Sequence, residues 1–283
     1  MTIDVICPLY NAEEYIVNMY RSLKKQEDVD IHKIKFILTE SKDKSEEILK
    51  ENNIEYELIK REEFSHSLTR EKAAMESESD IIVFITQDVI IEDKNWLYNL
   101  TKNIGKNKIA AAYSRQITKY NNIEKYTREC NYPEKSFTVS KNDINNLGLK
   151  TFFFSDASGA LDAKVFKKLK GYDAKKLPIS EDMYYAYKLI TNGYKINYEA
   201  DSIVYHSHKF TLKQLYDRYK LTGKFFKENS YLDQYGTNDS GIKLAKYTLQ
   251  RSIKEGNIKS LFRWLPDMVA RYLGMKAGKK KNA

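Results

Sequence analysis

The sequence predicts an α/β protein with a mostly parallel sheet flanked by helices, followed by a basic, helical C-terminal extension. Short apolar runs rich in β-branched residues alternate with helical patterns over the first part of the chain, as is typical of right-handed βαβ units. Positive charge is concentrated after residue 208, where the chain has 17 basic and 6 acidic residues. Because the net charge of the whole chain is +9, residues 1–208 carry a net charge of about −2. We therefore expect a domain over residues 1–210 and a helical extension over residues 211–283.

Composition excludes several classes of protein. The chain has 283 residues, of which 42% are hydrophobic and 31% charged, so it can bury a sizeable core. Its two cysteines, Cys7 and Cys130, cannot form a disulfide framework, which favours a reducing compartment. No apolar run reaches the roughly 18–20 residues that span a bilayer, and the start does not read as a signal peptide. We expect a cytoplasmic protein.

Four early segments are predicted strands: residues 3–7, 34–38, 55–59 and 80–85. A helix is expected after the first strand through about Lys25, with Asn11 and Glu14 spaced as a capping box. Asp43 and Glu46 repeat that spacing after the second strand. The segment after Ser65 also has a helical pattern, through about residue 78.

The later part of the chain contains three further predicted elements. Ser180 is a predicted N-cap for a helix over residues 181–192 that is closed by Gly193. Residues 203–205 read as a strand. Residues 150–161 mix aromatic and small polar residues, a pattern that fits either the wall of a binding cleft or a strand followed by a turn.

Ligands of parallel α/β sheets bind beyond the carboxyl ends of the strands, and Asp88 follows an apolar strand there. The sequence has no G-x-G-x-x-G and no Walker loop, which disfavours an ordinary dinucleotide dehydrogenase or a P-loop enzyme. A carboxylate at this position can hold a hard divalent cation that neutralises a diphosphate. The alternative is an ordinary turn residue at the end of a strand.

Two histidines follow the 203–205 strand. His206 and His208 occupy alternate positions, and in an extended chain such side chains point to opposite faces. We therefore expect only one of them to reach a given metal, without deciding which. Either histidine also fits a packed or surface residue.

Charged residues on two predicted helices have both a structural and a functional interpretation. Glu181 and Asp182 complement a helix dipole, or one of them deprotonates an acceptor hydroxyl while the other orients it. Arg70 is either a solvated helix charge or a guanidinium whose fork matches a phosphate.

The C-terminal segment has the pattern of an amphipathic helix. Apolar residues recur three and four positions apart between residues 261 and 273, and four lysines follow. The apolar positions are Leu261, Trp264, Leu265, Met268, Val269 and Tyr272, and the lysines are Lys276, Lys279, Lys280 and Lys281. This pattern predicts contact with an anionic membrane surface, or a helix docked on the domain with a frayed tail; Pro266 is expected to kink or restart the helix.

In this order the motifs resemble family-2 glycosyltransferases, which have the Rossmann-like GT-A fold and transfer sugars from nucleotide diphosphates with inversion. The resemblance covers about residues 1–210 and begins with Val5-Ile6-Cys7-Pro8-Leu9-Tyr10-Asn11. It implies that Pro8 and Tyr10 line the nucleobase pocket and that Glu40 contacts the base. Arg70 falls on the family's nucleotide-binding arginine.

The same resemblance implies the remaining site residues. Thr86-Gln87-Asp88 occupies the D-x-D position, with Asp88 as a ligand of Mg²⁺ or Mn²⁺ and His206 completing the coordination. Glu181-Asp182 matches the E-D motif, whose Asp is the catalytic base. Asp156 would face the acceptor.

Several blocks are similar to bacterial rhamnosyltransferase-like members of the family. They include residues 64–70, 113–116, 154–160 and 204–208. By this resemblance the donor is a dTDP-sugar such as dTDP-rhamnose. The acceptor is a glycan or lipid-linked glycan of polysaccharide or cell-wall biosynthesis, at the inner face of the cell membrane.

Two other functions compete with this interpretation. The single acid at the D-x-D position fits a binding or scaffold protein with the same fold and no transferase activity. The basic tail fits a nucleic-acid contact, although the sequence lacks zinc-finger spacing, an RNP-like motif and a basic-region zipper. We therefore expect no nucleic-acid partner.

Overall fold

The computed structural model describes residues 1–280 and, within that range, all side chains except those of residues 237–240. Lys281 of the predicted basic tail lies outside the described residues.

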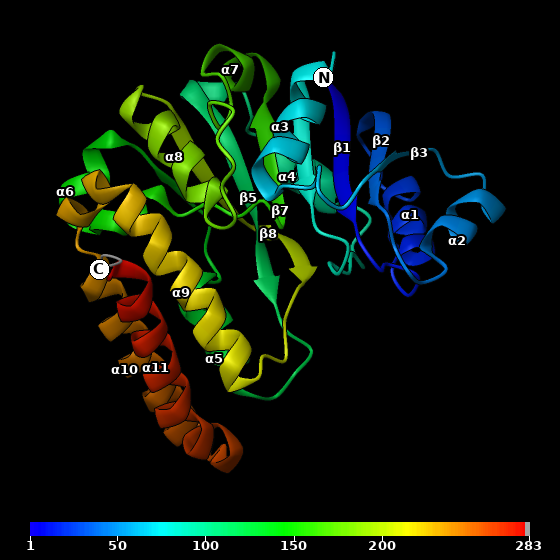
Figure 1. The fold of residues 1–283 in the computed structure, drawn as a ribbon. Coiled ribbons are helices and arrows are strands. Elements are labelled where there is room, and N and C mark those ends of the chain that lie inside the picture. The colour runs from blue at the N-terminus through cyan, green and yellow to red at the C-terminus, as the bar shows by residue number, and fades with distance from the viewer. Residues whose placement is uncertain (281–283) are drawn as a thin grey trace.

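The centre of the molecule is one eight-stranded sheet with the order β3-β2-β1-β4-β7-β5-β8-β6 (Figure 1). Its strands are β1 (Thr2–Leu9), β2 (Asp30–Thr39), β3 (Tyr56–Ile59), β4 (Ile81–Ile85), β5 (Ile109–Ile117), β6 (Phe137–Val139), β7 (Ser158–Asp162) and β8 (Lys195–Tyr205). Strand β7 runs antiparallel to its neighbours β4 and β5, and β6 runs antiparallel to β8. The other pairings are parallel, so six strands end at the same edge of the sheet.

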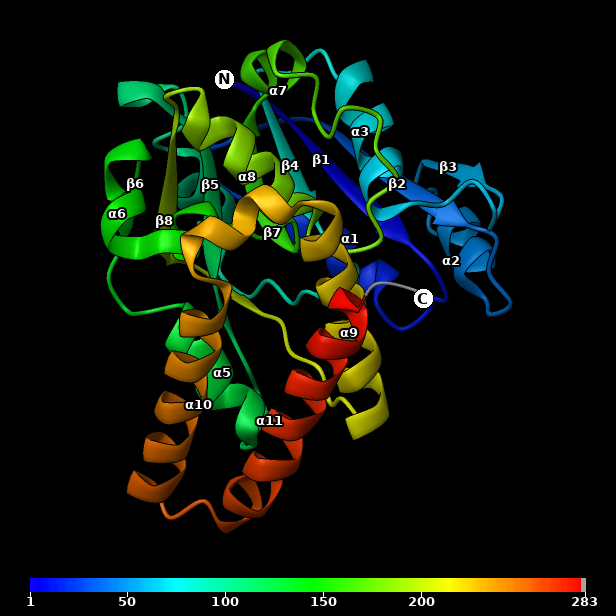
Figure 2. The same ribbon diagram turned by 60° about the vertical axis from the view of Figure 1, so that its left-hand side comes forward.

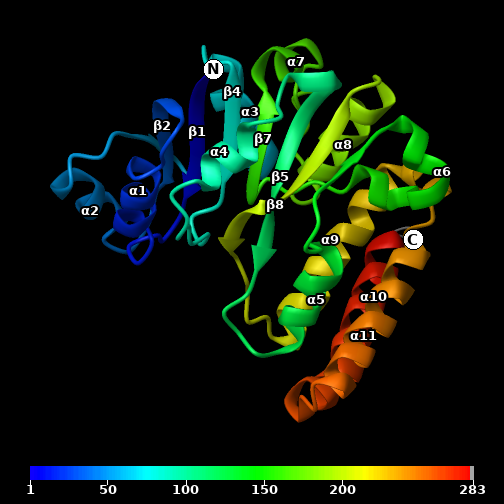
Figure 3. The same ribbon diagram turned by 180° about the vertical axis from the view of Figure 1, so that it is seen from behind.

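Helices cover both faces of this sheet. The helices of the described residues are α1 (Ile16–Lys24), α2 (Ser45–Glu51), α3 (His66–Glu76), α4 (Trp96–Thr101), α5 (Ile123–Asn131), α6 (Ile144–Leu147), α7 (Ala163–Lys168), α8 (Glu181–Thr191), α9 (Leu212–Glu228), α10 (Thr237–Lys254) and α11 (Ile258–Lys279). Helices α3, α7 and α8 lie on one face, and α1, α2 and α4 lie on the other (Figure 1, Figure 3). Short 3₁₀ turns occupy residues 106–108, 141–143, 148–152 and 230–235.

Strand β4 shows why the sequence folds this way. All five of its residues are buried, which is typical of a parallel strand covered on both faces. Ile82 and Phe84 belong to the core beneath α3, α7 and α8, whereas Ile81, Val83 and Ile85 belong to the core beneath α1, α2 and α4. The four strands predicted in residues 1–85 are confirmed.

The predicted helix starts are only partly confirmed. Ser65 caps α3, since its Oγ accepts from the backbone N of Leu68 at 3.4 Å. Asn11 does not cap α1, which begins at Ile16; Asn11 has φ 46° and its Oδ1 accepts from the backbone N of Lys42. Asp43 lies just before the cap position of α2 and binds Ser45 through both N–H and hydroxyl. Asn11 and Asp43 therefore form hydrogen bonds between the loops after β1 and β2 instead of forming capping boxes.

The C-terminal helices form a layer beside the sheet. Helix α9 follows β8, α11 lies along α9, and α10 lies along α5 (Figure 2). Helix α11 is continuous over its 22 residues with Pro266 inside it, so the expected restart at this proline is wrong. Among the described residues, no helix has the length and apolar character needed to cross a membrane.

Glycines allow α9 and α11 to approach closely. A Cβ built on Gly274 would overlap the backbone oxygen of Tyr216, and one on Gly278 would overlap that of Lys220. Gly223 of α9 makes the reciprocal contact with the backbone of Met275. Close approach of the two backbones therefore requires residues without a side chain at these three positions.

We expect Gly274→Ala to lower the free energy of unfolding by about 1–3 kcal/mol, because the added methyl meets rigid backbone. Gly241→Ala is the matched control, since nothing lies within 4 Å of a Cβ at that exposed helical position. The control should be neutral or more stable by up to about 1 kcal/mol through helix propensity. Urea unfolding followed by circular dichroism measures both; equal stabilities for the two variants would contradict the close contact.

Candidate active site

The carboxyl edge of the sheet collects most of the predicted site residues. Tyr10, Asp88 and His206 each follow the end of a strand that runs toward this edge. Asp156 reaches the same edge from the opposite direction, because it precedes the antiparallel strand β7. The parallel pairing of β5 with β8 also places Gln116 beside the end of β8.

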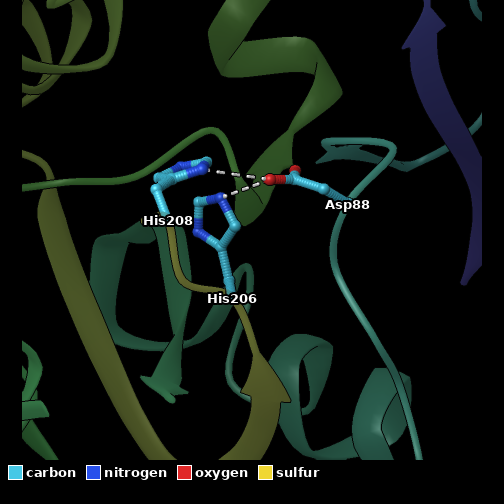
Figure 4. A group of neighbouring side chains, drawn as sticks. All are labelled: Asp88, His206 and His208. Atoms are coloured by element: carbon cyan, nitrogen blue, oxygen red, sulfur yellow. Dashed lines mark ion pairs between the residues drawn. The ribbon is translucent and has the colours of Figure 1, made fainter. Parts of the chain in front are cut away.

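Asp88, His206 and His208 converge on one point (Figure 4). Oδ2 of Asp88 lies 3.4 Å from Nε2 of His206 and 3.5 Å from Nδ1 of His208. The expectation that only one histidine can reach a given metal is therefore wrong. Strand β8 ends at Tyr205, so the alternation of an extended chain no longer applies to the two histidines, and their rings meet edge to face with centroids 4.7 Å apart.

Gln116 determines the proton position on His206. Its Oε1 accepts a hydrogen bond from Nη1 of Arg128, which can only donate. Nδ1 of His206 lies 2.8 Å from the same oxygen and must therefore be the donor. Nε2 of the neutral ring consequently keeps its lone pair and faces the carboxylate of Asp88. Two acceptors facing each other in this way suit a shared cation.

The charge states of the cluster agree with that role. Burial alone would raise the pKa of Asp88, but the hydrogen bond and positive charge that the imidazoles supply when protonated, with a smaller contribution from Thr86, hold the pKa of this carboxyl well below its usual range. Burial, together with His206, lowers the pKa of His208 to about 4. At neutral pH the carboxylate is charged and His208 is neutral. Among the described residues, these three form the group of His, Cys, Asp and Glu side chains whose ligand atoms lie within 4.8 Å of one another, and their mixed carboxylate and imidazole donor set fits a divalent transition-metal ion such as Mn²⁺ better than Mg²⁺, which prefers oxygen ligands.

Gln87, at the middle of the D-x-D position, has a structural role. Its Nε2 donates to the backbone oxygen of Tyr10 at 3.0 Å, and its Oε1 accepts from the backbone N of Tyr10 at 2.8 Å. The amide therefore fixes the loop after β1 to the loop after β4. The side chain of Gln87 is uncharged, so it adds no negative charge beside Asp88.

A second cluster contains the acids. Nη1 of Arg70 lies 3.3 Å from Oε1 of Glu181, and both residues are buried. The hydroxyl of Tyr172 donates to Oδ2 of Asp156 at 2.6 Å. Burial, and then the charge of Glu181, raise the pKa of Asp156 to about 7, although Arg70 opposes this shift. Oδ1 of Asp156 and Nε of Arg70 are buried without a hydrogen-bond partner.

Asp182 combines partial exposure with a raised basicity. Its Oδ1 accepts from the backbone N of Met183 at 2.7 Å. Burial and the charges of Glu181 and Asp156 raise the pKa of Asp182 well above its usual range. A carboxylate with a raised pKa is a better general base. Ser180 occupies the predicted N-cap position before this acid pair, but it is left-handed at φ 63° and its side chain makes no capping hydrogen bond.

A hydrogen-bonded path joins the two clusters. Nε2 of Gln116 donates to Oγ of Ser155 at 2.8 Å, and the next residue is Asp156. Electrostatic interaction adds a second link, because Arg218 of α9 acts on the pKa of both Asp182 and His208. These contacts link the cluster of Asp88, His206 and His208 with the cluster of acids.

The predicted nucleobase residues lie farther along the same edge. Pro8 is half-buried in β1, and the guanidinium carbon of Arg61 lies 5.5 Å from the ring centroid of Tyr10. Glu40 follows β2 directly, with an exposed side chain. Their contact with a base stays a prediction.

Sequence reasoning missed several residues of the site. Gln116, Arg128 and Tyr172 orient the predicted residues through hydrogen bonds. Gln116 belongs to the 113–116 block that resembles rhamnosyltransferase-like members, and this block was the only signal for it. Arg128 and Tyr172 reach the site from α5 and from the loop before α8, and no local pattern indicates such contacts.

Comparisons with known proteins agree with this geometry. Residues 4–170 match the model of Glycosyl transferase family 2. The chain is 33% identical over 293 residues to the O-antigen chain rhamnosyltransferase RfbN of Salmonella typhimurium, covering 99% of this chain and 90% of that protein. It is 34% identical over 285 residues to the O-antigen chain rhamnosyltransferase WbaN of Salmonella anatum, covering 97% and 88%.

Solved structures show the fold. The mannosyltransferase PcManGT of Pyrobaculum calidifontis, in complex with GDP-Man and Mn²⁺, superimposes with a TM-score of 0.63 at 12% identity, covering 98% of this chain and 86% of that one. S. aureus TarS 1–349, in complex with UDP, gives 0.57 at 16% identity, covering 98% and 90%. The predicted GT-A class is confirmed, and the comparisons support an enzyme over a non-catalytic scaffold. The chain belongs to glycosyl transferase family 2 and is a nucleotide-sugar-dependent glycosyltransferase.

Proposed function

We propose that this enzyme transfers rhamnose from a nucleoside diphosphate, with dTDP-rhamnose as donor, to a lipid-linked glycan of the O-antigen type, with inversion. The convergence of Asp88, His206 and His208 beside the buried acids carries this proposal. Its substrate class rests on the two rhamnosyltransferases to which the chain is about one-third identical over nearly its whole length.

Asp88, His206 and His208 would together hold Mg²⁺ or Mn²⁺. The bound ion would supply positive charge for the diphosphate that leaves the sugar. The protein's own part is to keep Nε2 of His206 free of a proton through Gln116. Arg70, which falls on the family's nucleotide-binding arginine, would bind the donor.

Asp182 is the proposed general base, and Asp156 is proposed to bind the acceptor. In a single displacement, the acceptor oxygen bonds to the anomeric carbon as the bond from that carbon to the diphosphate oxygen breaks. The hydroxyl proton moves to Oδ2 of Asp182, because Oδ1 already accepts from Met183. Glu181, paired with Arg70, maintains the negative charge that raises the pKa of this base.

We expect Asp182→Asn to lower turnover by about two to four orders of magnitude, because the amide cannot take the proton. Donor binding should be nearly unchanged. Release of dTDP, UDP or GDP from the corresponding sugar nucleotides, measured with and without manganese, identifies the donor and follows the rate. Asp201→Asn, an exposed acid outside the site, is the matched control; full activity of Asp182→Asn would refute the assignment.

Gln116→Leu should weaken Mn²⁺ binding by about 10–100-fold, because His206 loses the acceptor that fixes its tautomer. Gln116→Glu keeps an acceptor for both His206 and Arg128 and should retain binding. Electron paramagnetic resonance of free Mn²⁺ gives the affinity, and thermal unfolding of the metal-free proteins reports folding. Loss of binding in both variants would show that the acceptor is not the cause.

The exposed face of α11 supports association with an anionic membrane surface. Its outward residues are apolar and spaced three or four apart, and the exposed Lys276 and Lys280 follow them. The apolar residues are Ile258, Phe262, Leu265, Val269 and Tyr272. This stripe differs in part from the predicted one, because Trp264 turns inward and donates to the backbone oxygen of Ala245. The apolar face with adjacent cations complements a bilayer of anionic lipid.

Phe262→Ser with Leu265→Ser should reduce binding to phosphatidylglycerol vesicles by at least about tenfold, because two large apolar side chains leave the bilayer interface. The control replaces Ile242 and Ile253 by serine. These residues are also exposed, but they lie on α10. Cosedimentation measures the bound fraction. Equal binding by both double variants would remove α11 as the membrane face.

A further inference from the structure

A cavity of about 420 Å³ lies where three helices begin. Its wall contains the cap residues of two of them, Asn122 of α5 and Thr211 of α9. Lys259 and Ser260, in the first turn of α11, close the third side. The positive ends of the α5 and α9 dipoles therefore lie at this volume, while α11 runs along its side, and this arrangement favours an anion there. We call this cavity the basic pocket.

Side-chain charge adds to the dipoles. Lys209, Lys259, Arg263 and Arg271 all line the basic pocket. The two acids in its wall are already paired: Glu124 with Arg128 at 2.8 Å, and Asp267 with Arg263. The ammonium groups of the exposed Lys209 and Lys259 leave a surplus of positive charge at the pocket.

Two buried polar groups in the wall have no hydrogen-bond partner. Ser260 is 1% exposed, and its Oγ is unpaired. Nε of Arg271 is also unpaired, although its Nη1 donates to the hydroxyl of Tyr219. Unpaired buried donors are costly, and acceptor oxygens in the pocket would offer such a group a partner. A phosphate has that chemistry.

The position of the basic pocket connects it with both ends of the proposed reaction. His208 lines the pocket and also faces Asp88. Lys259 and Arg263 flank Phe262, the most exposed apolar residue of α11. The pocket therefore lies between the proposed membrane face and the proposed metal site.

We infer that the basic pocket binds the phosphate or diphosphate group of the acceptor and so holds the lipid-linked end of that molecule near the membrane. This inference rests on the proposed function for the identity of the acceptor. The anion site itself is independent of it, because the helix ends, the surplus charge and the unpaired donors are properties of the pocket alone.

Inorganic pyrophosphate tests the anion site directly. Isothermal titration in EDTA removes any ion-mediated binding at Asp88. Lys209→Ala with Lys259→Ala should bind pyrophosphate about tenfold more weakly than the unchanged protein, since two exposed charge contacts are lost. Lys246→Ala with Lys254→Ala removes the same charge from exposed positions of α10 outside the pocket and should bind normally. Ser260→Ala should also weaken binding.

Steady-state kinetics test the assignment to the acceptor. The Lys209 and Lys259 double variant should raise KM for a diphosphate-linked acceptor about tenfold, with KM for the donor unchanged. With a phosphate-free acceptor sugar, both double variants should match the unchanged enzyme. Binding to vesicles that contain a polyprenyl phosphate, compared with binding to phosphatidylglycerol vesicles, distinguishes the acceptor phosphate from an ordinary headgroup. If the Lys209 and Lys259 double variant loses the same affinity for both kinds of vesicle, the assignment to the acceptor is overturned.

The outcomes separate this inference from the proposed function. Equal pyrophosphate affinity in the two double variants, or no binding by the unchanged protein, would refute the anion site. Competition between pyrophosphate and a nucleoside diphosphate for the pocket would place it in the donor site and overturn its role toward the acceptor. If no sugar is transferred under any condition, the proposed function fails, and the titration still decides whether the pocket binds an anion.

Discussion

The candidate metal site depends on the two hydrogen bonds that the amide oxygen of Gln116 accepts. This oxygen accepts from Arg128 and from His206 at the same time, so it fixes both the orientation of the imidazole and the nitrogen that carries its proton. The sheet maintains this contact, because β5 pairs in parallel with β8 and the backbone N of His206 donates to the oxygen of Ile117 at 2.9 Å. Without that pairing the two histidines would be ordinary loop residues.

The acids form a coupled system around a single arginine. Besides burial, the charge of Glu181 raises the pKa of Asp156, and the charges of Glu181 and Asp156 raise the pKa of Asp182, while Arg70 opposes the shift at Asp156. Like charges in a poorly solvated space cannot all ionise easily. The group therefore retains a proton more readily than isolated carboxylates would. A base of this kind can accept a proton from a hydroxyl near neutral pH, which matches the proposed chemistry.

The sequence predicts the central part of the fold because local chemistry is enough there. Five apolar residues bounded by polar ones, as in β4, have few alternatives to a buried strand. The errors arise where distant segments decide. Asn11 bonds to a loop after β2, and Trp264 turns toward α10, and neither partner can be identified from spacing.

The site shows the same division. The order of motifs predicted the acids, Arg70 and Asp88 as site residues. The approach of both His206 and His208 to Asp88 depends on where β8 ends, and the motifs do not show that. Arg128 and Tyr172 could not be predicted, because their role comes from hydrogen bonds to side chains on other elements of the fold. A residue that positions another leaves no local pattern in the sequence.

The glycine contacts between α9 and α11 have a consequence for how this enzyme can be divided. Helix α9 carries Arg218, whose charge acts on Asp182 and His208, and α11 fits against that helix with backbone in contact. The C-terminal region therefore contributes charge to the candidate site as well as an outer surface. Cutting the chain before α11 would uncover the helix that holds Arg218, so a shortened protein could lose activity for reasons unrelated to lipid. Changes confined to outward-facing side chains keep these two contributions separate.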